Sequence, residues 1–172
     1  MIKTELNLCL NETEWETALP EYEEISTKVV SLTVNHVSQD TTSYISKLNK
    51  ELSFNLCLSN NKEIHTLNKE FRDKDKPTNV LSFANIDDDE FETYAQNSPF
   101  VEMGDIIIAL ETMQHEAQEK QISLHDHFCH LLTHGVLHLL GYDHIEDSEA
   151  EYMENLEIEI LQLLNINNPY GE

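Results

Sequence analysis

Residues 134–144, His-Gly-Val-Leu-His-Leu-Leu-Gly-Tyr-Asp-His, constrain the fold of this chain more than any other segment. Residues four positions apart lie on one face of an α-helix, so a helix here would point His134 and His138 in the same direction. Gly141 follows three residues later, and a glycine can adopt the positive φ that ends a helix and reverses the chain. The sequence therefore predicts a helix that ends near Gly141 and a turn that carries His144 back over the helical face.

Three imidazoles that converge on one point, with a fourth position left open, form the ligand set of a catalytic zinc site. The spacing H-x-x-x-H-x-x-G-x-x-H is that of the metzincin proteases, except that Gly135 stands where those enzymes carry glutamate. We therefore expect His134, His138 and His144 to bind one Zn²⁺ ion. The alternative is a hydrogen-bonded histidine cluster with a structural role. His130, one turn before His134, is either a partner of a ligand or a packing residue.

Gly135 changes the chemistry that such a metal site can support. In the H-E-x-x-H proteases the glutamate is the general base that takes a proton from the zinc-bound water. Glycine has no side chain for this task, so peptide hydrolysis by the usual route would lack its base. Either the substrate supplies the reacting group, or another residue such as Asp143 or Glu146 serves as the base. Asp143 could instead orient a ligand imidazole.

The charge of the chain restricts its partners. It has 10 Lys and Arg residues against 33 Asp and Glu residues, and its net charge of -23 repels nucleic acid overall. Half of the basic residues nevertheless lie between Lys62 and Lys76. Arg72, the only arginine, is in this segment, and its guanidinium suits bidentate contact with phosphate. Its structural alternative is a favourable interaction with the dipole at the end of a helix.

Cysteine usage and hydropathy indicate the compartment. Cys9, Cys57 and Cys129 are far apart and form no C-x-x-C motif, as is typical of free thiols in a reducing environment. The N-terminal residues lack the apolar core of a signal peptide, and no apolar run approaches the length that spans a membrane. We therefore expect a cytoplasmic protein with no membrane contact.

The spacing of apolar residues predicts an α+β fold in which residues 1–172 form a single domain. It places strands at about 2–10, 53–58, 80–83 and 104–110. It places helices at about 20–38, 62–71, 111–120, 123–140 and 148–164, with a short amphipathic piece at 44–48. The expected architecture is one mixed sheet of about four strands packed by about five helices.

Three local features refine this prediction. Pro77 is expected to stop the helix that contains Arg72. The acidic stretch from Asn85 to Pro99, headed by the acidic residues of 87–92, is expected to be an exposed loop or hairpin tip. The sequence Ser-Glu-Ala-Glu at 148–151 fits a capping box at the start of the last helix, whose apolar face is expected to include Tyr152 and Leu163.

Two segments together resemble the YbeY family of bacterial metal-dependent endoribonucleases. Residues 134–144 closely resemble one signature of that family. Residues 72–83, Arg-Asp-Lys-Asp-Lys-Pro-Thr-Asn-Val-Leu-Ser-Phe, resemble its second hallmark. Gly-Asp-Ile at 104–106 and Asp-His-Ile-Glu-Asp at 143–147 fit as well. The resemblance covers roughly residues 52–169, and the motifs are specific in combination.

The resemblance implies an activity and partners that the residue pattern alone does not give. It implies one zinc ion held by His134, His138 and His144, and a functional arginine at Arg72. It implies cleavage of single-stranded RNA in 16S rRNA 3′-end maturation and in ribosome quality control. The implied partners are the rRNA precursor in the small subunit, ribosomal proteins and an Era-type GTPase.

An RNA substrate also suits the residues themselves. RNA carries its own nucleophile, the 2′-OH, and zinc with Arg72 could stabilise the charge that builds on its phosphate. We expect Lys74 and Lys76 to make local contacts with the RNA. Because the chain as a whole is so acidic, we expect a protein or ribosomal partner to deliver the substrate. The alternatives are a non-catalytic ribosome assembly factor with a structural zinc and a metzincin-like metallohydrolase.

Overall fold

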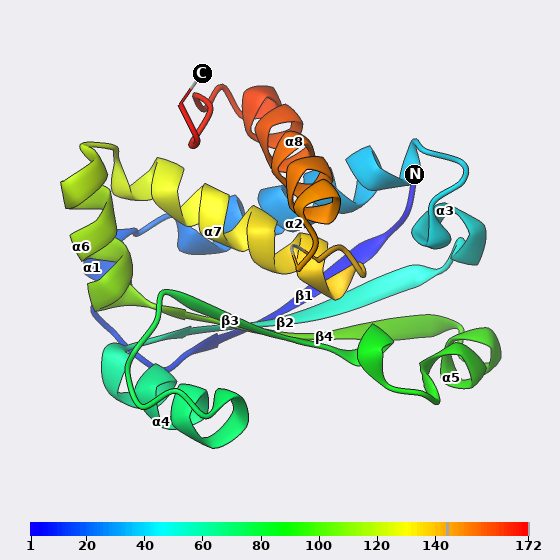
Figure 1. Cartoon of the computed structure of the whole chain (residues 1–172), viewed down its shortest axis with the longest axis horizontal. Helices are drawn as coiled ribbons and strands as arrows, with labels where there is room; N and C mark the ends of the chain where they lie inside the picture. The colour runs from blue at the N-terminus through cyan, green and yellow to red at the C-terminus, as the bar shows by residue number, and fades with distance from the viewer. Residues whose placement is uncertain (144, 172) are drawn as a thin grey trace.

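The computed structural model describes residues 1–143 and 145–171 and contains a four-stranded mixed sheet (Figure 1). The strands are β1 (Thr4–Leu10), β2 (Glu51–Ser59), β3 (Val80–Ala84) and β4 (Phe100–Ala109), and they lie in the order β1-β2-β4-β3. The strands β1, β2 and β4 run parallel, whereas β3 pairs antiparallel with β4. The mixed sheet confirms the α+β class predicted from the sequence.

Helices cover both faces of this sheet. The described residues form eight of them: α1 (Trp15–Ala18), α2 (Tyr22–Ser38), α3 (Tyr44–Leu48), α4 (Asn61–Arg72), α5 (Phe91–Asn97), α6 (Leu110–Lys120), α7 (Leu124–Leu139) and α8 (Asp147–Leu163). The count exceeds the five long helices and one short piece expected because α1 and α5 are short and weakly patterned. None of the helices in the described ranges combines the length and the apolar character needed to cross a membrane.

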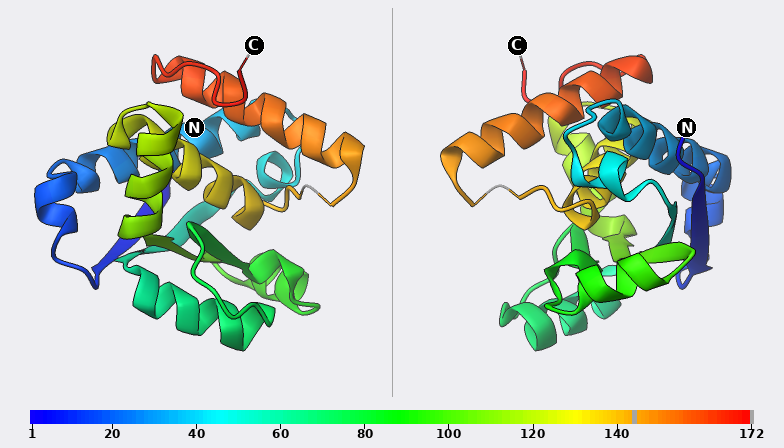
Figure 2. Two further views of the ribbon diagram at one scale, coloured as in Figure 1. Left: turned by 60° about the vertical axis from the view of Figure 1, so that its left-hand side comes forward. Right: turned by 90° about the vertical axis from the view of Figure 1, so that its right-hand side faces the viewer.

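The helices on one face form two layers. Helix α7 packs against β3 and β4, with α2 beside it on β1, and α8 lies over both on the side away from the sheet (Figure 2). Helix α4 covers part of the opposite face. This arrangement makes α7 a central helix. Its apolar residues fill the core, and Phe128, Leu132, Val136 and Leu139 are fully buried.

Two glycines determine how α7 meets the sheet and where it ends. A Cβ atom at Gly135 would lie 3.1 and 3.2 Å from two side-chain carbons of Ile106 and 3.3 Å from Oγ of Ser82, so glycine allows the helix to approach the sheet closely. Gly141 has a φ of 100° and turns the chain just after the helix, as the sequence predicted. At the other end of the helix Ser123 is the N-cap, since its Oγ accepts a hydrogen bond from the backbone N–H of Asp126.

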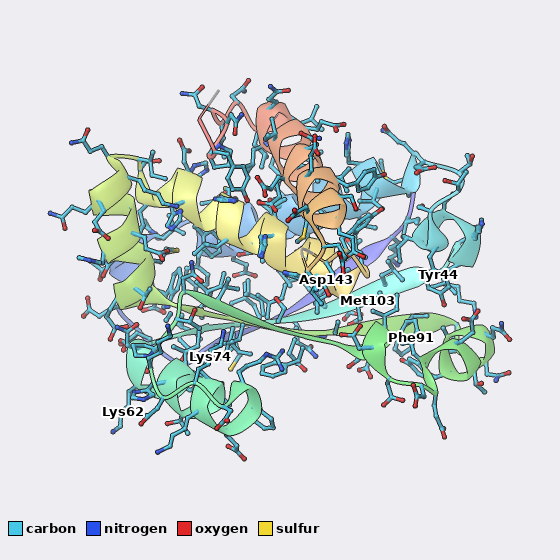
Figure 3. The ribbon with its side chains drawn as sticks, viewed as in Figure 1. Tyr44, Lys62, Lys74, Phe91, Met103 and Asp143 are labelled. Carbon is cyan, nitrogen blue, oxygen red and sulfur yellow. The ribbon has the colours of Figure 1, made fainter. Side chains whose placement is uncertain are left out.

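The prediction that residues 85–99 form a loop or hairpin tip is wrong. The segment contains the 3₁₀ turn η1 (Asn85–Asp87) and the helix α5. Phe91 and Ala95, one helical turn apart, are buried, and the ring of Phe91 lies 6.3 Å from that of Tyr44 (Figure 3). The sequence did not predict this helix because the segment is rich in acidic residues, and only Phe91 and Ala95 of the helix are buried in the core.

The predictions for the start and the inner face of α8 are also wrong in part. The helix begins at Asp147 after Glu146, whose side chain makes no capping hydrogen bond, so the predicted capping box from Ser148 does not form. Tyr152 and Leu163, expected on the apolar face, are 51% and 56% exposed. The buried face instead includes a carboxylate, that of Glu157.

Candidate functional site

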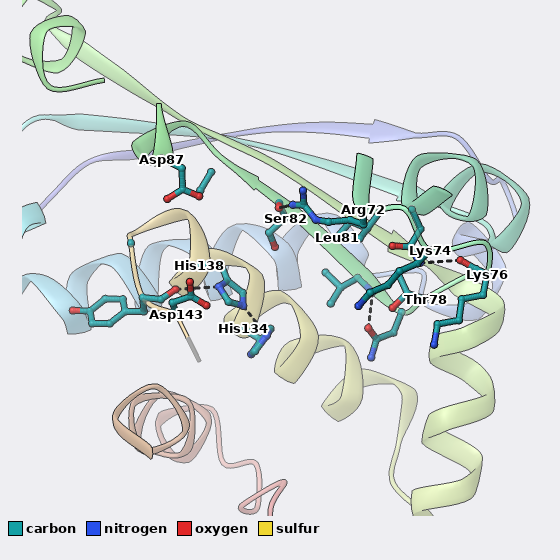
Figure 4. Close-up of a pocket in the computed structure, with 16 residues that line it drawn as sticks. Arg72, Lys74, Lys76, Thr78, Leu81, Ser82, Asp87, His134, His138 and Asp143 are labelled. Carbon is teal, nitrogen blue, oxygen red and sulfur yellow. Dashed lines mark hydrogen bonds between the residues drawn. The ribbon is translucent and has the colours of Figure 1, made fainter. Parts of the chain in front are cut away.

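His134 and His138 project from the same face of α7, and their Nε2 atoms lie 3.0 Å apart (Figure 4). The Nδ1 atom of each ring faces a hydrogen-bond acceptor. Nδ1 of His134 lies 3.0 Å from Oε2 of Glu157, and Nδ1 of His138 lies 3.0 Å from the carbonyl oxygen of Tyr142. Acceptors at Nδ1 assign the proton of each neutral ring to that atom and direct both Nε2 lone pairs toward one point.

This arrangement fits a bound transition metal. Zn–N bonds at tetrahedral angles place two ligand nitrogens about 3.3 Å apart, close to the 3.0 Å separation of the Nε2 atoms. Within the described ranges, no three His, Cys, Asp or Glu side chains are grouped so that they could hold a metal ion. The third predicted ligand, His144, lies outside the described residues. The structure thus brings two of the three predicted ligands together, and the metal itself stays a prediction.

Glu157 is a buried carboxylate on α8 that joins the candidate ligands to a wider hydrogen-bond network. Its Oε1 accepts hydrogen bonds from Nε2 of His130 and from the hydroxyl of Tyr170, both at 2.7 Å, while its Oε2 faces His134. Burial alone would raise the pKa of this carboxyl group, but the hydrogen bonds from His130, His134 and Tyr170 outweigh it and lower the pKa to about 2. Glu157 is therefore ionised at neutral pH. His130 therefore contacts Glu157, the partner of a candidate ligand, rather than a candidate ligand itself.

A cleft of about 520 Å³ connects the two histidines with the basic segment that follows α4 (Figure 4). Its wall includes residues from three parts of the chain: Arg72, Lys74 and Lys76 near the end of α4, Ser82 on β3, and His134, His138 and Asp143 on α7 and the turn after it. The three basic side chains are exposed. The cleft therefore combines a candidate metal site with positive charge on a strongly acidic protein.

Arg72 is the last residue of α4, and its guanidinium is held against β3. Its Nη2 donates a 2.8 Å hydrogen bond to the carbonyl oxygen of Ser82, and its Cζ lies 4.7 Å from the centre of the Phe83 ring. The helix stops here because Asp73 adopts the left-handed conformation with a φ of 57°. The predicted stop at Pro77 is therefore wrong, since the helix has ended before the chain reaches the proline.

The two predicted bases are not equally close to the cleft. Asp143 lines the cleft beside the histidines. Glu146 instead lines a neighbouring hollow, which shares Gly141, Tyr142 and Asp143 with the cleft. Asp143 therefore has the better position for proton transfer to or from a group bound beside His134 and His138.

Comparison with known proteins decides the family. The profile of the family described as Endoribonuclease YbeY matches residues 15–165. The chain belongs to the YbeY family. It is 41% identical to Endoribonuclease YbeY of Bartonella bacilliformis, over 97% of both chains. It is 46% identical to Endoribonuclease YbeY of Zymomonas mobilis, over 79% of this chain and 78% of the relative.

A solved structure agrees at the level of the fold. The solution structure of TM1509 from Thermotoga maritima matches with a TM-score of 0.50 and 23% identity, over 93% of this chain and 91% of that chain. At this identity the likeness concerns the fold alone. The resemblance to YbeY inferred from the two motifs is therefore confirmed by sequence comparison, and the α+β fold has a counterpart of known structure.

The sequence pattern missed three residues that shape the site of this YbeY-family chain. Asn68, only 2% exposed, donates from its side chain to the carbonyl oxygen of Lys76 at 2.9 Å and so holds the basic segment. The side chain of Asn79 accepts a hydrogen bond from the N–H of Val80 and donates one to Glu116 at 3.0 Å, and these bonds hold the end of the basic segment that leads into β3. Glu157 is the third. The sequence contained one sign of its role, because Glu157 is a charged residue at the helical spacing of the buried residues of α8.

Proposed function

We propose that this YbeY-family protein is a zinc-dependent endoribonuclease that cleaves single-stranded RNA. In this proposal it acts in the cytoplasm on the 3′ end of the 16S rRNA precursor and in ribosome quality control. The family profile is described as that of an endoribonuclease, and the curated relatives carry the same name. The observation that carries the proposal is the cleft that joins two convergent histidines to Arg72.

His134, His138 and His144 would hold the ion. Zinc supplies a Lewis acid in such a site, with a coordination position open to the substrate. The pair of Nδ1 hydrogen bonds keeps the Nε2 atoms of His134 and His138 available as donors to the metal. The third ligand is proposed from the sequence spacing and the family resemblance.

Arg72 would bind the scissile phosphate. Its guanidinium is exposed and presents donors in a planar fork that suits two phosphate oxygens at once. The contact with Ser82 and the Phe83 ring limits the rotamers of the side chain, so less conformational entropy is lost when phosphate binds. Lys74 and Lys76 would contact neighbouring phosphates along the same wall.

Asp143 is the candidate for the proton-transfer step. Its carboxylate lines the cleft on the side of the candidate ligands, within the turn that follows α7. It would accept the proton of the nucleophile, which is either the 2′-OH of the RNA or a water molecule. The two routes leave different ends, since attack by the 2′-OH forms a 2′,3′-cyclic phosphate and attack by water does not.

The acidity of the chain bears on how the substrate reaches this cleft. With a net charge of -23, the protein is expected to bind naked RNA weakly at physiological salt. We propose that the small-subunit precursor delivers the RNA, with ribosomal proteins and an Era-type GTPase as partners. Cleavage should therefore be much faster on precursor particles than on the same RNA stripped of protein.

The test combines metal analysis with cleavage on defined substrates. The purified protein should contain one zinc ion per chain, and it should cut the 3′ end of 16S rRNA in precursor particles. Removal of zinc with a chelator should abolish cleavage, and added zinc should restore it. Cells that lack the protein should accumulate 16S rRNA with an unprocessed 3′ end. Full cleavage in the chelator would contradict the proposal, and equal rates on particles and bare RNA would contradict the delivery step.

The two alternatives predict different results. A metzincin-like protease needs a base at position 135, where close packing against Ile106 leaves little space for a glutamate side chain. Digestion of a peptide library would detect such an activity, and we expect none. A ribosome assembly factor with a structural zinc would tolerate loss of Arg72 without any change in rRNA maturation. The open cleft beside the histidines favours catalysis, because structural zinc sites are closed by four protein ligands.

A further inference from the structure

The carboxylate of Glu157 lies between a candidate metal ligand and the C-terminal segment of the chain. It is fully buried on α8, and a buried charge is costly unless its oxygens are well paired. Three donors satisfy it. His134 donates to Oε2 from Nδ1 at 3.0 Å, and His130 and Tyr170 donate to Oε1 at 2.7 Å each.

The position of Tyr170 depends on a folded C-terminal segment. After α8 the chain reverses at Asn165, which has a φ of 61°. Ile166 is 7% exposed, and its N–H donates to the carbonyl oxygen of Leu161 at 2.9 Å. Asn168 then accepts the N–H of Tyr170 through its side chain at 2.8 Å. These contacts return the segment along α8, so that the tyrosine hydroxyl reaches the carboxylate.

We infer that Glu157 is the positioning residue of the metal centre and that Tyr170 and His130 act on the centre through it. Its Oε2 holds the proton of His134 on Nδ1 and fixes the orientation of the ring, so that Nε2 faces the metal position. The donors on Oε1 prevent the carboxylate from rotating away from His134. This inference rests on the proposed zinc site, and it adds the residues that set the affinity of that site.

A purely structural ion pair is the competing explanation. Such a pair would stabilise the packing of α7 against α8 but would have no specific effect on the metal. The geometry favours positioning because the carboxylate meets His134 at Nδ1, opposite the nitrogen that faces His138. A carboxylate at that atom selects the tautomer and increases the basicity of the ligand, and loss of such a partner typically weakens metal binding by about 10–100-fold.

The test measures zinc affinity rather than RNA cleavage. Wild-type protein, Glu157→Gln, Tyr170→Phe and Glu151→Gln are each titrated with zinc in competition with a chromophoric chelator. Glu151 is an exposed carboxylate on the same helix and gives the matched control. Glutamine keeps the shape of the side chain but replaces one acceptor oxygen with an amide donor. We expect Glu157→Gln to lose about 10–100-fold in zinc affinity, Tyr170→Phe to show a smaller but measurable loss, and the control to match the wild type.

A second measurement reports the tautomer directly. The ¹⁵N shifts of the His134 ring in the zinc-free protein at neutral pH should show the proton on Nδ1 in the wild type. They should show a mixture of tautomers in Glu157→Gln. A role confined to stability would not move this signal in a protein that remains folded.

The outcomes separate this inference from the proposed function. Weaker zinc binding by both variants, with a folded protein by circular dichroism, supports positioning. If Glu157→Gln does not fold, the milder Tyr170→Phe decides, and wild-type zinc affinity in that variant overturns the inference. Zinc affinity unchanged in Glu157→Gln overturns it as well and leaves the nuclease proposal standing. A wild-type protein that binds no zinc overturns both.

Discussion

The Nη2 atom of Arg72 donates a hydrogen bond to the carbonyl oxygen of Ser82 across 2.8 Å. This contact ties the exposed end of α4 to the strand β3, on which α7 also packs. The single arginine of the chain is therefore attached to the same framework as His134 and His138. The contacts with Ser82 and the Phe83 ring restrain the Arg72 side chain on the wall of the cleft, although it is exposed.

Arg72→Ala should remove activity without harming the fold. The guanidinium is exposed, so we expect the free energy of unfolding to change by less than about 1 kcal/mol and zinc content to stay the same. RNA cleavage should fall by about 10²–10³-fold, as is typical when a donor to a developing charge is removed. Arg72→Lys should be intermediate, because it keeps the charge and loses the fork. Lys69→Ala, on the exposed last turn of α4, is the control. Wild-type cleavage by Arg72→Ala would exclude a catalytic role.

Position 135 should reject the glutamate of the metzincins. The Cβ of Gly135→Ala would meet Ile106 at 3.1 Å, so the small gain from replacing a helical glycine should be offset by repacking, with a net change within about 1 kcal/mol. Gly135→Glu adds a charged side chain at this tight contact between α7 and the sheet. It should lower the free energy of unfolding by at least about 2 kcal/mol. Urea unfolding of both variants in EDTA checks this. A stable Gly135→Glu protein would show that the packing is loose.

The local pattern of residues 134–141 was sufficient to predict the central part of the site. A spacing of four residues on a helix and a glycine just after it determine where two imidazoles point, and neither depends on distant parts of the chain. The strands could also be predicted from the sequence, because β1 and β2 alternate apolar and polar residues and β4 contains a continuous apolar run. The YbeY resemblance linked the histidines to Arg72, which no periodicity could do.

The parts that the sequence did not predict depend on contacts between distant elements. The contact between Glu157 and His134 depends on how α8 packs across α7. The sequence of one helix does not show which of its acidic residues meets a histidine of the neighbouring helix. Asn68 and Asn79 were missed for the same reason, because each fixes the basic segment through long-range hydrogen bonds. Helix α5 was missed because Phe91 and Ala95 have their partners in other elements.

The buried carboxylate should make the zinc-free protein sensitive to acid. The folded-state pKa of Glu157 is about 2, below its ordinary value of 4.5, so the unfolded state binds the proton more tightly. The stability that Glu157 contributes is therefore present above about pH 4.5 and is lost as the pH falls toward 2. Urea unfolding in EDTA at several pH values should show a shallower decline for Glu157→Gln, by up to about 1.4 kcal/mol per pH unit. Glu151→Gln should follow the wild type. Parallel curves for all three proteins would contradict the low pKa.

The basic wall of the cleft should determine how RNA binding depends on salt. Lys74 and Lys76 line the cleft, whereas Lys62 lies near the start of α4, away from it (Figure 3). Each lysine that neutralises one phosphate of a single strand contributes about 0.7 to the slope of log K against log salt. We therefore expect Lys74→Gln and Lys76→Gln each to reduce that slope by about 0.7, and Lys62→Gln to leave it unchanged.

Fluorescence anisotropy of a labelled single-stranded RNA, measured in EDTA so that metal-dependent cleavage is suppressed, gives the affinities for these slopes. The double variant should lose about twice as much slope as either single variant, because the two contacts would involve different phosphates. The bases of the RNA should matter little to this loss, since phosphate contacts carry no sequence information. An equal loss in Lys62→Gln would mean that the lysines act only through net charge, and the cleft would then have no special role in holding RNA.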